Sequence, residues 1–324
     1  MFADIIIYIL LFFISFFPIV IWAYAFSFTD ENPLNKKRFL AGILAGVLSV
    51  IPILYIDKIM SVLKFEYLNV FYFVSKIKDL LSSLEFGLSL SLFLFLIIIF
   101  SFFLGGFFKN KTKIFSIYIK NTLVFLIFII FLSLFLFLIG FLFSKFDFII
   151  DNPINFGNIV FDTLKLIIFY YVIVAFIEEA SKHFNFLQSS IFYIKNIKDG
   201  VLYAIFIALG FSFIENMLYL YNYYLSYGIS TELLKLYFFR SSFSVMVHVL
   251  SSSIISYYFT RALMLYRGKD LSFPYLKIFS FGIFISVLLH LIFDVALTLG
   301  FVFIIFIYFI GGYLYVSSIF YKED

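Results

Sequence analysis

Apolar runs of about 20 residues recur along the whole chain, with more polar segments between them. A helix of that length crosses the roughly 30 Å hydrocarbon core of a bilayer, and helices satisfy their own backbone hydrogen bonds in lipid. The chain is 64% hydrophobic and 13% charged, whereas a soluble domain has about 25% charged residues with which to cover its surface. The pattern predicts an all-α, polytopic helical membrane protein, and it excludes soluble enzymes, nucleic-acid-binding proteins and disordered chains.

About nine windows are long and apolar enough to be transmembrane helices. They cover residues 5–28, 39–56, 86–108, 122–143, 164–182, 200–221, 236–258, 273–297 and 301–320. Asp4 precedes the first window, which has no basic residue before it and is longer than the core of a signal peptide. We therefore expect this first window to be a retained span.

The segment of residues 57–85 is mixed rather than apolar, because four lysines are spaced among its aromatic residues. This composition predicts an interfacial amphipathic segment. Basic residues also set the orientation, since cytoplasmic loops carry an excess of Lys and Arg. The odd-numbered loops and the C-terminal tail carry about two thirds of the 23 basic residues, so we expect the N-terminus outside and the C-terminus in the cytoplasm.

The two halves of the chain differ in kind. The first four windows are rich in Phe, Leu and Ile, whereas the fifth to eighth contain all three histidines and several carboxylates. We therefore expect residues 1–160 to form a transmembrane scaffold and residues 161–324 to form a bundle that holds the active site. The chain has no cysteine, which excludes disulfides, thiolate metal ligands and a cysteine nucleophile.

A charged residue within a transmembrane helix costs several kcal/mol on insertion scales, so each one is a candidate functional residue. The first cluster is Glu178 and Glu179, directly after the apolar stretch 166–177, with Lys182 and His183 one turn further on. The ordinary interpretation is a solvated helix end with i,i+4 pairs. Two adjacent carboxylates after an apolar run favour a functional interpretation, in which one of them accepts a proton.

Three further clusters lie in the sixth, seventh and eighth windows. They are Glu215 with Asn216, Arg240 with His248 and the serines 251–253, and His290 with Asp294. The first could be an interhelical hydrogen bond, and the second a satisfied core histidine. The i,i+4 spacing of the third places imidazole and carboxylate on one helix face, where Asp294 can orient the ring or share an ion with it. Because the four clusters lie on successive helices, a bundle can gather them around one site.

Depth in the membrane is a difficulty for such a site. Glu178 lies toward the cytoplasmic end of the fifth window, whereas Glu215 and His290 lie nearer the outer half of theirs. At a rise of about 1.5 Å per residue, the offset approaches roughly 10 Å. We therefore expect a fifth helix that starts later than its apolar window and continues past Lys182.

The region from Phe176 to Asp294 resembles the PrsW family of intramembrane proteases, which is related to the CAAX-processing and bacteriocin-processing membrane endopeptidases. Four motifs in order carry this resemblance. They are Glu-Glu-x-x-Lys at residues 178–182, Phe-x-x-x-Glu-Asn at residues 211–216 after Asp199-Gly200, an Arg-then-His helix with Arg240 and His248, and His-x-x-x-Asp at residues 290–294. The similarity covers about 120 residues, and the first four windows match no motif.

The resemblance implies hydrolysis of a peptide bond within or near the bacterial cytoplasmic membrane. The implied substrate is a membrane-anchored protein, and an anti-sigma factor is one candidate. Hydrolysis needs an activated water, an oxyanion stabiliser and a cleft that admits an extended peptide. The expected catalytic residues are Glu178, Glu179, His248, His290 and Asp294, and the expected polar floor on the substrate side is Lys182, Glu215, Asn216 and Arg240. Glu178 or Glu179 is the natural general base, with Glu178 favoured.

Two mechanisms use these residues. Zinc sites normally have three protein ligands and a water, and His248, His290 and Glu215 could supply them, with Glu179 as the alternative carboxylate. His183 is expected to lie too near the interface. The chain has no His-Glu-x-x-His motif, and a glutamate mechanism without metal would use the histidines as oxyanion donors. The expected cofactor is therefore zinc or none.

Ion-coupled transporters and channels also place carboxylates and histidines inside the membrane. The sequence shows no internal repeat of the kind that many transporters have. A protease-like scaffold that has lost catalysis is a third interpretation, but every motif position is retained here. The favoured interpretation is an intramembrane peptidase whose partners are a membrane-anchored substrate and the bilayer, with no nucleic acid.

Overall fold

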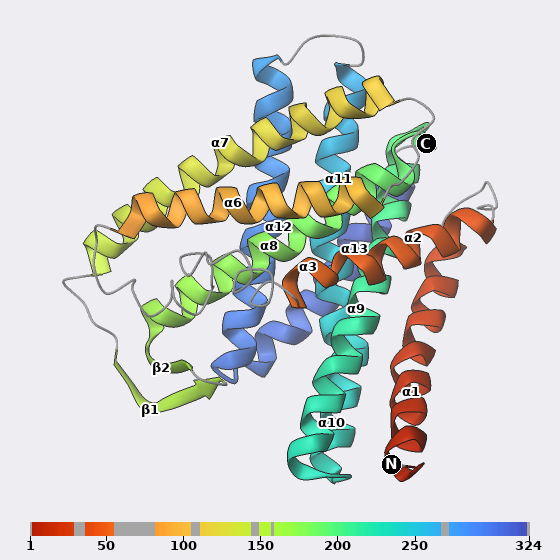
Figure 1. Cartoon of the computed structure of the whole chain (residues 1–324), viewed down its shortest axis with the longest axis vertical. Coiled ribbons are helices and arrows are strands. Elements are labelled where there is room, and N and C mark those ends of the chain that lie inside the picture. The colour runs from red at the N-terminus through yellow and green to blue at the C-terminus, as the bar shows by residue number, and fades with distance from the viewer. Residues whose placement is uncertain are drawn as a thin grey trace.

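The computed structural model of the chain is a bundle of helices with one short β-hairpin (Figure 1). It describes residues 2–28, 36–54, 82–104, 111–143, 149–156, 159–266 and 272–322. The helices are α1 (Phe2–Ser27), α2 (Lys36–Ser49), α3 (Ile51–Leu54), α6 (Ser82–Leu104), α7 (Lys111–Phe143), α8 (Leu164–Ser190), α9 (Ile197–Tyr227), α10 (Thr231–Phe239), α11 (Val245–Leu265), α12 (Phe273–Thr298) and α13 (Val302–Lys322). A π-helical turn, η2 (Arg240–Ser244), joins α10 to α11, and the strands are β1 (Ile149–Phe156) and β2 (Ile159–Thr163).

The predicted class, a helical membrane protein, is confirmed. Within the described ranges, six helical segments are long and apolar enough to cross a membrane: α1, α7, α9, the continuous α10–α11, α12 and α13. All nine predicted windows overlap helices. The apolar stretch of α8 is short, however, because Lys165 and Glu178 limit it, so the number of nine membrane crossings stays a prediction.

The second window does not form one continuous helix. α2 ends at Ser49 and α3 begins at Ile51, with Pro52 directly after the break. Proline has no N–H for the helical ladder, and its ring clashes with the preceding turn. Most of the predicted interfacial segment, up to residue 81, lies outside the described residues, and its last residues begin α6.

The β-hairpin ahead of α8 is not among the elements predicted from sequence. Its strands are antiparallel, with Ile154 opposite Phe161, and the register shifts between Ile149 and Ile154. Phe161 is fully buried against Ile167 and Tyr170 of α8. The hairpin is therefore fixed to the first turns of the helix that bears the paired glutamates.

The fifth helix differs from its prediction at one end. α8 continues to Ser190, past Lys182 as expected, but the later start is wrong, because the helix begins at Leu164. Figure 1 shows α8 running obliquely to α9. Since the helices are inclined to each other, residues at different depths of their apolar windows can meet.

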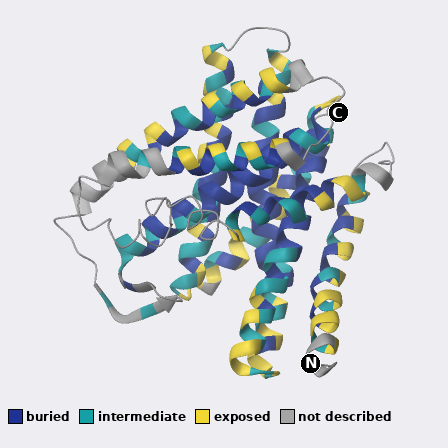
Figure 2. Ribbon diagram, viewed as in Figure 1, coloured by how far each residue is buried: buried dark blue, intermediate teal, exposed yellow. Residues whose placement is uncertain are grey.

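The core lies where α8, α9, α11 and α12 pack against one another. Figure 2 shows these crossings as buried, and the outer helices have exposed faces that are rich in Phe and Leu, as a lipid-facing surface requires. α2 and α9 approach until their backbones touch. A Cβ added to Gly46 would lie 2.0 Å from the carbonyl oxygen of Ile207, and one on Gly210 would lie 2.0 Å from that of Ile43. Small residues permit this approach, which sets the position of α9.

Candidate active site

Polar side chains from four helices meet at the buried crossing of the bundle. The structure brings the nine residues predicted for the site into one connected group, the polar cluster. Its members are Glu178, Glu179 and Lys182 on α8, Glu215 and Asn216 on α9, Arg240 in η2, His248 on α11, and His290 and Asp294 on α12. The rings of His248 and His290 stand edge to face, with 5.0 Å between their centroids.

Glu179 is fully buried and connects three helices. Its Oε1 accepts from Lys182 Nζ at 2.5 Å and from Ser251 Oγ at 2.8 Å. The same oxygen lies 2.8 Å from Nδ1 of His290, which donates to the carboxylate. A carboxylate bound to one ring nitrogen fixes the ring and leaves the other nitrogen for a ligand. Glu179 therefore orients His290.

Glu178 has a different environment from its neighbour. Its Oε2 lies 3.6 Å from His290 Nε2 and 3.8 Å from His248 Nδ1. This oxygen is buried and has no hydrogen-bond partner within the described part of the chain. The solvated-end interpretation expects i,i+4 pairs of Glu178 with Lys182 and of Glu179 with His183. Instead, Lys182 bonds to Glu179, and His183 bonds to Asn121. The adjacent glutamates thus have separate positions, one bound and one facing the ring nitrogens.

Glu215 is held by two cationic or donor groups. His248 Nε2 donates to its Oε2 at 2.7 Å, and Arg240 Nη2 lies 2.8 Å from the same oxygen. Arg240 Nε donates to Asn216 Oδ1 at 2.9 Å, and the guanidinium stacks 3.7 Å from the ring centroid of Tyr219. Glu215 therefore orients His248 as Glu179 orients His290.

Arg240 begins the π-helical turn η2, a feature that often marks functional sites. The wider turn directly follows the last residue of α10, Phe239, and leads into α11. It places the Arg240 guanidinium over the ring of Tyr219 on α9. Trp22 of α1 donates from Nε1 to the carbonyl oxygen of Ser241 at 3.1 Å. An N-terminal helix thus stabilises the turn that positions Arg240.

Asp294 lies on the same helix face as His290, as its spacing predicts. Its Oδ2 is 3.6 Å from His290 Nε2, which is too long for a hydrogen bond. The orienting contact that sequence analysis expected from Asp294 comes from Glu179, on the opposite ring nitrogen. Asp294 is left facing the same space as Glu178.

That space is a cavity of about 350 Å³. One side is polar, with Glu178, Glu215, Arg240, His248, His290 and Asp294. The other walls are largely aromatic and aliphatic, and include Tyr170, Tyr171, Tyr219, Phe239, Phe243 and Phe293, with Ile154 of β1. An apolar cavity with a few convergent polar groups is the usual form of a substrate site.

A divalent metal fits one corner of the polar cluster. One ligand atom from each of Glu178, His248 and His290 lies within 4.8 Å of the others. Each histidine has one nitrogen on a carboxylate and the other toward Glu178, whose Oε2 has no hydrogen-bond partner among the described residues. This donor set suits a three-ligand zinc site with carboxylates behind the histidines. Glu215, the carboxylate expected in the ligand set, is bound to Arg240 and His248, and Glu178 occupies that place.

His183 lies apart from the polar cluster. Its Nε2 is 2.8 Å from Asn121 Oδ1 on α7, and rings including Phe125, Phe259 and Phe279 surround it. The residue is buried in the bundle rather than near the interface. It is a core histidine satisfied by an amide.

Several residues of the site were not singled out from sequence as partners. Ser251 binds Glu179, and Ser286 donates to the carbonyl oxygen of Ser251 at 2.8 Å. Ser251 lies one turn after His248 and Ser286 one turn before His290, so helical spacing places them on the same faces. Tyr171, two turns before Glu178, lines the cavity for the same reason. That spacing was the available signal.

Comparisons with known proteins cover the part of the chain that bears the polar cluster. Residues 124–319 match the family described as PrsW family intramembrane metalloprotease. Protease PrsW from Clostridioides difficile (strain 630) is 27% identical over 164 residues, which are 49% of this chain and 63% of that relative. The match therefore spans less than two thirds of the relative's length. No solved structure matches the chain.

Proposed function

The chain belongs to the PrsW family of intramembrane metalloproteases, and from this premise we propose that it hydrolyses a peptide bond of a membrane-anchored protein. One observation carries the proposal. A buried carboxylate oxygen, Glu178 Oε2, faces one nitrogen of each of two imidazole rings whose other nitrogens are held by carboxylates, at the wall of a 350 Å³ cavity. A transporter needs no such converging set of donors at one cavity, whereas hydrolysis does.

We assign the metal ligands to Glu178, His248 and His290, with zinc as the metal. A zinc ion held there would supply a Lewis acid for the scissile carbonyl and promote ionisation of a water. Glu179 holds the His290 ring through Nδ1, and Glu215 holds the His248 ring through Nε2. Arg240 neutralises the charge of Glu215 through an ion pair of 2.8 Å.

Proton transfer then requires a carboxylate that is not a ligand. Asp294 lines the cavity and makes no hydrogen bond to His290, from which it is 3.6 Å away. We propose that Asp294 Oδ2 accepts the proton of the attacking water and returns it to the leaving amine nitrogen, so that water adds across the peptide bond. Glu178 as the base is the alternative from sequence, and it requires a site in which Glu178 does not bind metal.

Comparative membrane proteomics of wild type and Glu178→Gln tests the activity. We expect a fragment of a membrane-anchored protein that is present with wild type and absent with the variant. Glu232→Gln is the control, because Glu232 is exposed and pairs with Lys235, which is not a member of the polar cluster. An unchanged fragment pattern in Glu178→Gln would contradict the peptidase. Zinc in purified Glu178→Gln separates the roles: a ligand loses the metal, whereas a base retains it.

The protein is a multi-pass integral membrane protein, and we propose that it lies in a bacterial cytoplasmic membrane with its N-terminus outside. Anti-sigma factors are the substrate class that the family resemblance suggests. Reporters fused after Arg38, Lys113, Lys198 and Lys269 should all report the cytoplasm, since the basic residues concentrate there. A reporter after Lys198 that reads outside would overturn this orientation.

A further inference from the structure

Lys182 is the only cation that contacts a proposed metal ligand among the described residues. Its side chain is almost fully buried. The ammonium Nζ donates to Glu179 Oε1 at 2.5 Å and lies 3.2 Å from Nδ1 of His248. It also lies 4.8 Å from the ring centroid of Phe211. A buried ammonium here is therefore held by one carboxylate, one imidazole and one aromatic face.

The contact with His248 involves the nitrogen that would bind the metal. Nε2 of His248 is occupied by Glu215, whereas Nδ1 is the nitrogen 3.8 Å from Glu178. An ammonium has no acceptor, so Nδ1 must present its lone pair to Lys182. The same lone pair is what a zinc ion needs. Lys182 thus holds the ligand atom in the form required for metal while blocking access to it.

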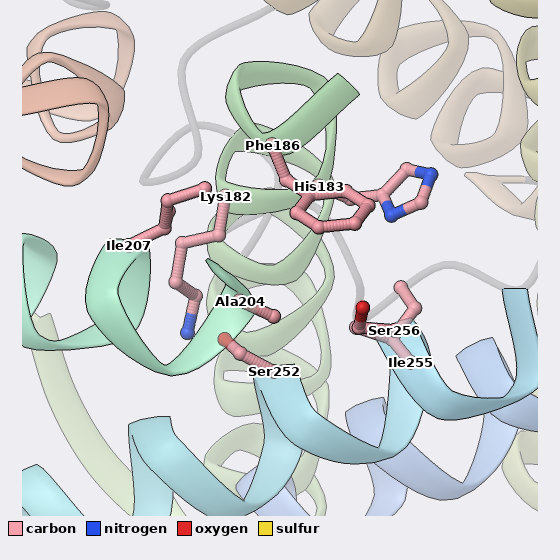
Figure 3. A pocket seen from close by; sticks show the side chains of 8 residues that line it. All are labelled: Lys182, His183, Phe186, Ala204, Ile207, Ser252, Ile255 and Ser256. Carbon is pink, nitrogen blue, oxygen red and sulfur yellow. The ribbon is translucent and has the colours of Figure 1, made fainter. Parts of the chain in front are cut away.

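A place for the ammonium to move lies directly beside it. A cavity of about 10 Å³, room for about one water, is lined by Lys182 and Ser252. Figure 3 shows the Lys182 side chain reaching from α8 toward Ser252 on α11, while the neighbouring His183 turns to the other side. Ser252 Oγ is buried and has no hydrogen-bond partner within the described ranges. This hydroxyl is an unused acceptor for a displaced ammonium.

We propose that Lys182 and the metal compete for one ligand atom, Nδ1 of His248, and that the ammonium turns to Ser252 when the metal enters. The inference rests on the zinc site of the proposed function. Lys182 is a positioning residue in this scheme, since it acts through His248 and Glu179. Without metal, its ammonium keeps the histidine and the carboxylate in place; with metal, its repulsion of the divalent ion limits the affinity.

Zinc affinity of the purified full-length protein, stripped with a chelator and titrated with Zn²⁺ against a chromogenic competitor, tests the competition. Lys182→Met keeps the length of the side chain and removes the ammonium, so we expect at least about tenfold tighter zinc binding. Ser252→Ala removes the second acceptor and should weaken zinc binding by about tenfold, the usual effect of losing a hydrogen bond to a charged group.

Ser253→Ala is the matched control. Ser253 Oγ is also buried without a hydrogen-bond partner among the described residues, but Ser253 does not line the cavity, so its zinc affinity should equal that of wild type. If wild type binds zinc and Lys182→Met binds it with equal or lower affinity, the competition is overturned while the zinc site stands. An unchanged affinity in Ser252→Ala would overturn the turn to Ser252. Absence of zinc binding in all variants would overturn the site itself, independently of the proteomic test of cleavage.

A measurement on wild type avoids any dependence on how the variants fold. The chain has three histidines, so ¹⁵N-labelled imidazoles of the wild type give few signals, and His183, which lies outside the polar cluster, is an internal reference. In the metal-free protein, His248 should be protonated at Nε2 and unprotonated at Nδ1. Addition of zinc should shift the Nδ1 signal. A proton on Nδ1 of His248 in the metal-free protein would overturn the proposal, because an ammonium could not then donate to it.

Discussion

Several serine side chains of the N-terminal helices differ in their hydrogen-bond partners from the serines beside the polar cluster. In α2, α6 and α7, Ser49, Ser101 and Ser133 donate to carbonyl oxygens three or four residues earlier in their own helix. In the bundle of α8, α9, α11 and α12, the bonds join helices, as from Ser251 to Glu179 and from Ser286 to the Ser251 carbonyl.

The two kinds of hydrogen bond serve different ends: one lets a helix insert into lipid, and the other positions two helices relative to each other. A hydroxyl bonded within its own helix satisfies its polarity in lipid but holds no neighbour in place. A bond between helices fixes the distance between two backbones, and a catalytic group needs that distance held to within about 0.5 Å. The interhelical serine bonds of Ser251 and Ser286 therefore hold the polar cluster in place, whereas the N-terminal helices reach the bundle through other side chains, such as Trp22 and Tyr118.

The histidines give the largest test of this comparison. His248→Ala and His290→Ala should each abolish binding of about one zinc equivalent, because each removes one of three ligands. His183→Ala should retain it, since that ring binds Asn121 within an aromatic cage. Metal analysis of the purified variants checks this. Equal zinc loss in all three would show that core disruption, and not ligation, governs metal binding.

Replacement of the proposed proton acceptor should separate chemistry from metal binding. Asp294→Asn keeps the shape of the side chain but removes its basicity, so cleavage should fall by about 10²–10⁴-fold. Zinc content should stay at the wild-type level, because Asp294 lies outside the ligand group. The fragment identified by proteomics, quantified over time, gives the rate. Loss of zinc from this variant would instead make Asp294 a ligand.

Much of the fold could be predicted from local hydropathy. An apolar run must form a helix wherever lipid surrounds it, so the windows at residues 164–182 and 273–297 correspond to α8 and α12. The break before Pro52 and the hairpin at residues 149–163 depend on backbone geometry and on packing against α8. Hydropathy predicts neither the break nor the hairpin, because it averages over a window of residues and so loses the effect of a single proline or of one packed side chain.

The members of the site were also accessible, but their partners were not. Glu178, His248 and His290 stand out because charged or polar residues are costly in apolar runs. Sequence does not reveal that Glu215 pairs with Arg240 while Glu178 keeps an unbonded oxygen, since both are glutamates in apolar surroundings. Three-dimensional packing decides which carboxylate is a partner of an arginine and which faces the histidines.

Loss of the buried pair of Glu179 and Lys182 should affect zinc affinity and cleavage more than loss of an exposed pair of identical spacing. Glu179→Gln should lower zinc affinity and cleavage by about 10–100-fold, the usual effect of losing a carboxylate behind a ligand. Glu232→Gln is the control, because Glu232 and Lys235 are also three residues apart but exposed, and exposed pairs contribute little. Zinc titration and fragment rates measure both. A complete loss equal to that of Glu178→Gln would give both glutamates the same role.

The packing of the N-terminal half against the bundle gives the smallest expected effect. In Gly210→Ala, the new Cβ would lie 2.0 Å from the carbonyl oxygen of Ile43, and backbone cannot move aside as a flexible side chain does. α2 and α9 must separate, which should lower the free energy of unfolding by about 3 kcal/mol, the upper end for overpacking.

Gly311→Ala in α13 is the control, since nothing lies within 4 Å of its Cβ position. There the better helix propensity of alanine should stabilise the protein by up to about 1 kcal/mol. Unfolding of both variants in the same detergent measures the opposite signs. A neutral Gly210→Ala would mean that α2 does not fix the position of α9, and hence of Glu215, so that the bundle alone would determine the geometry of the site.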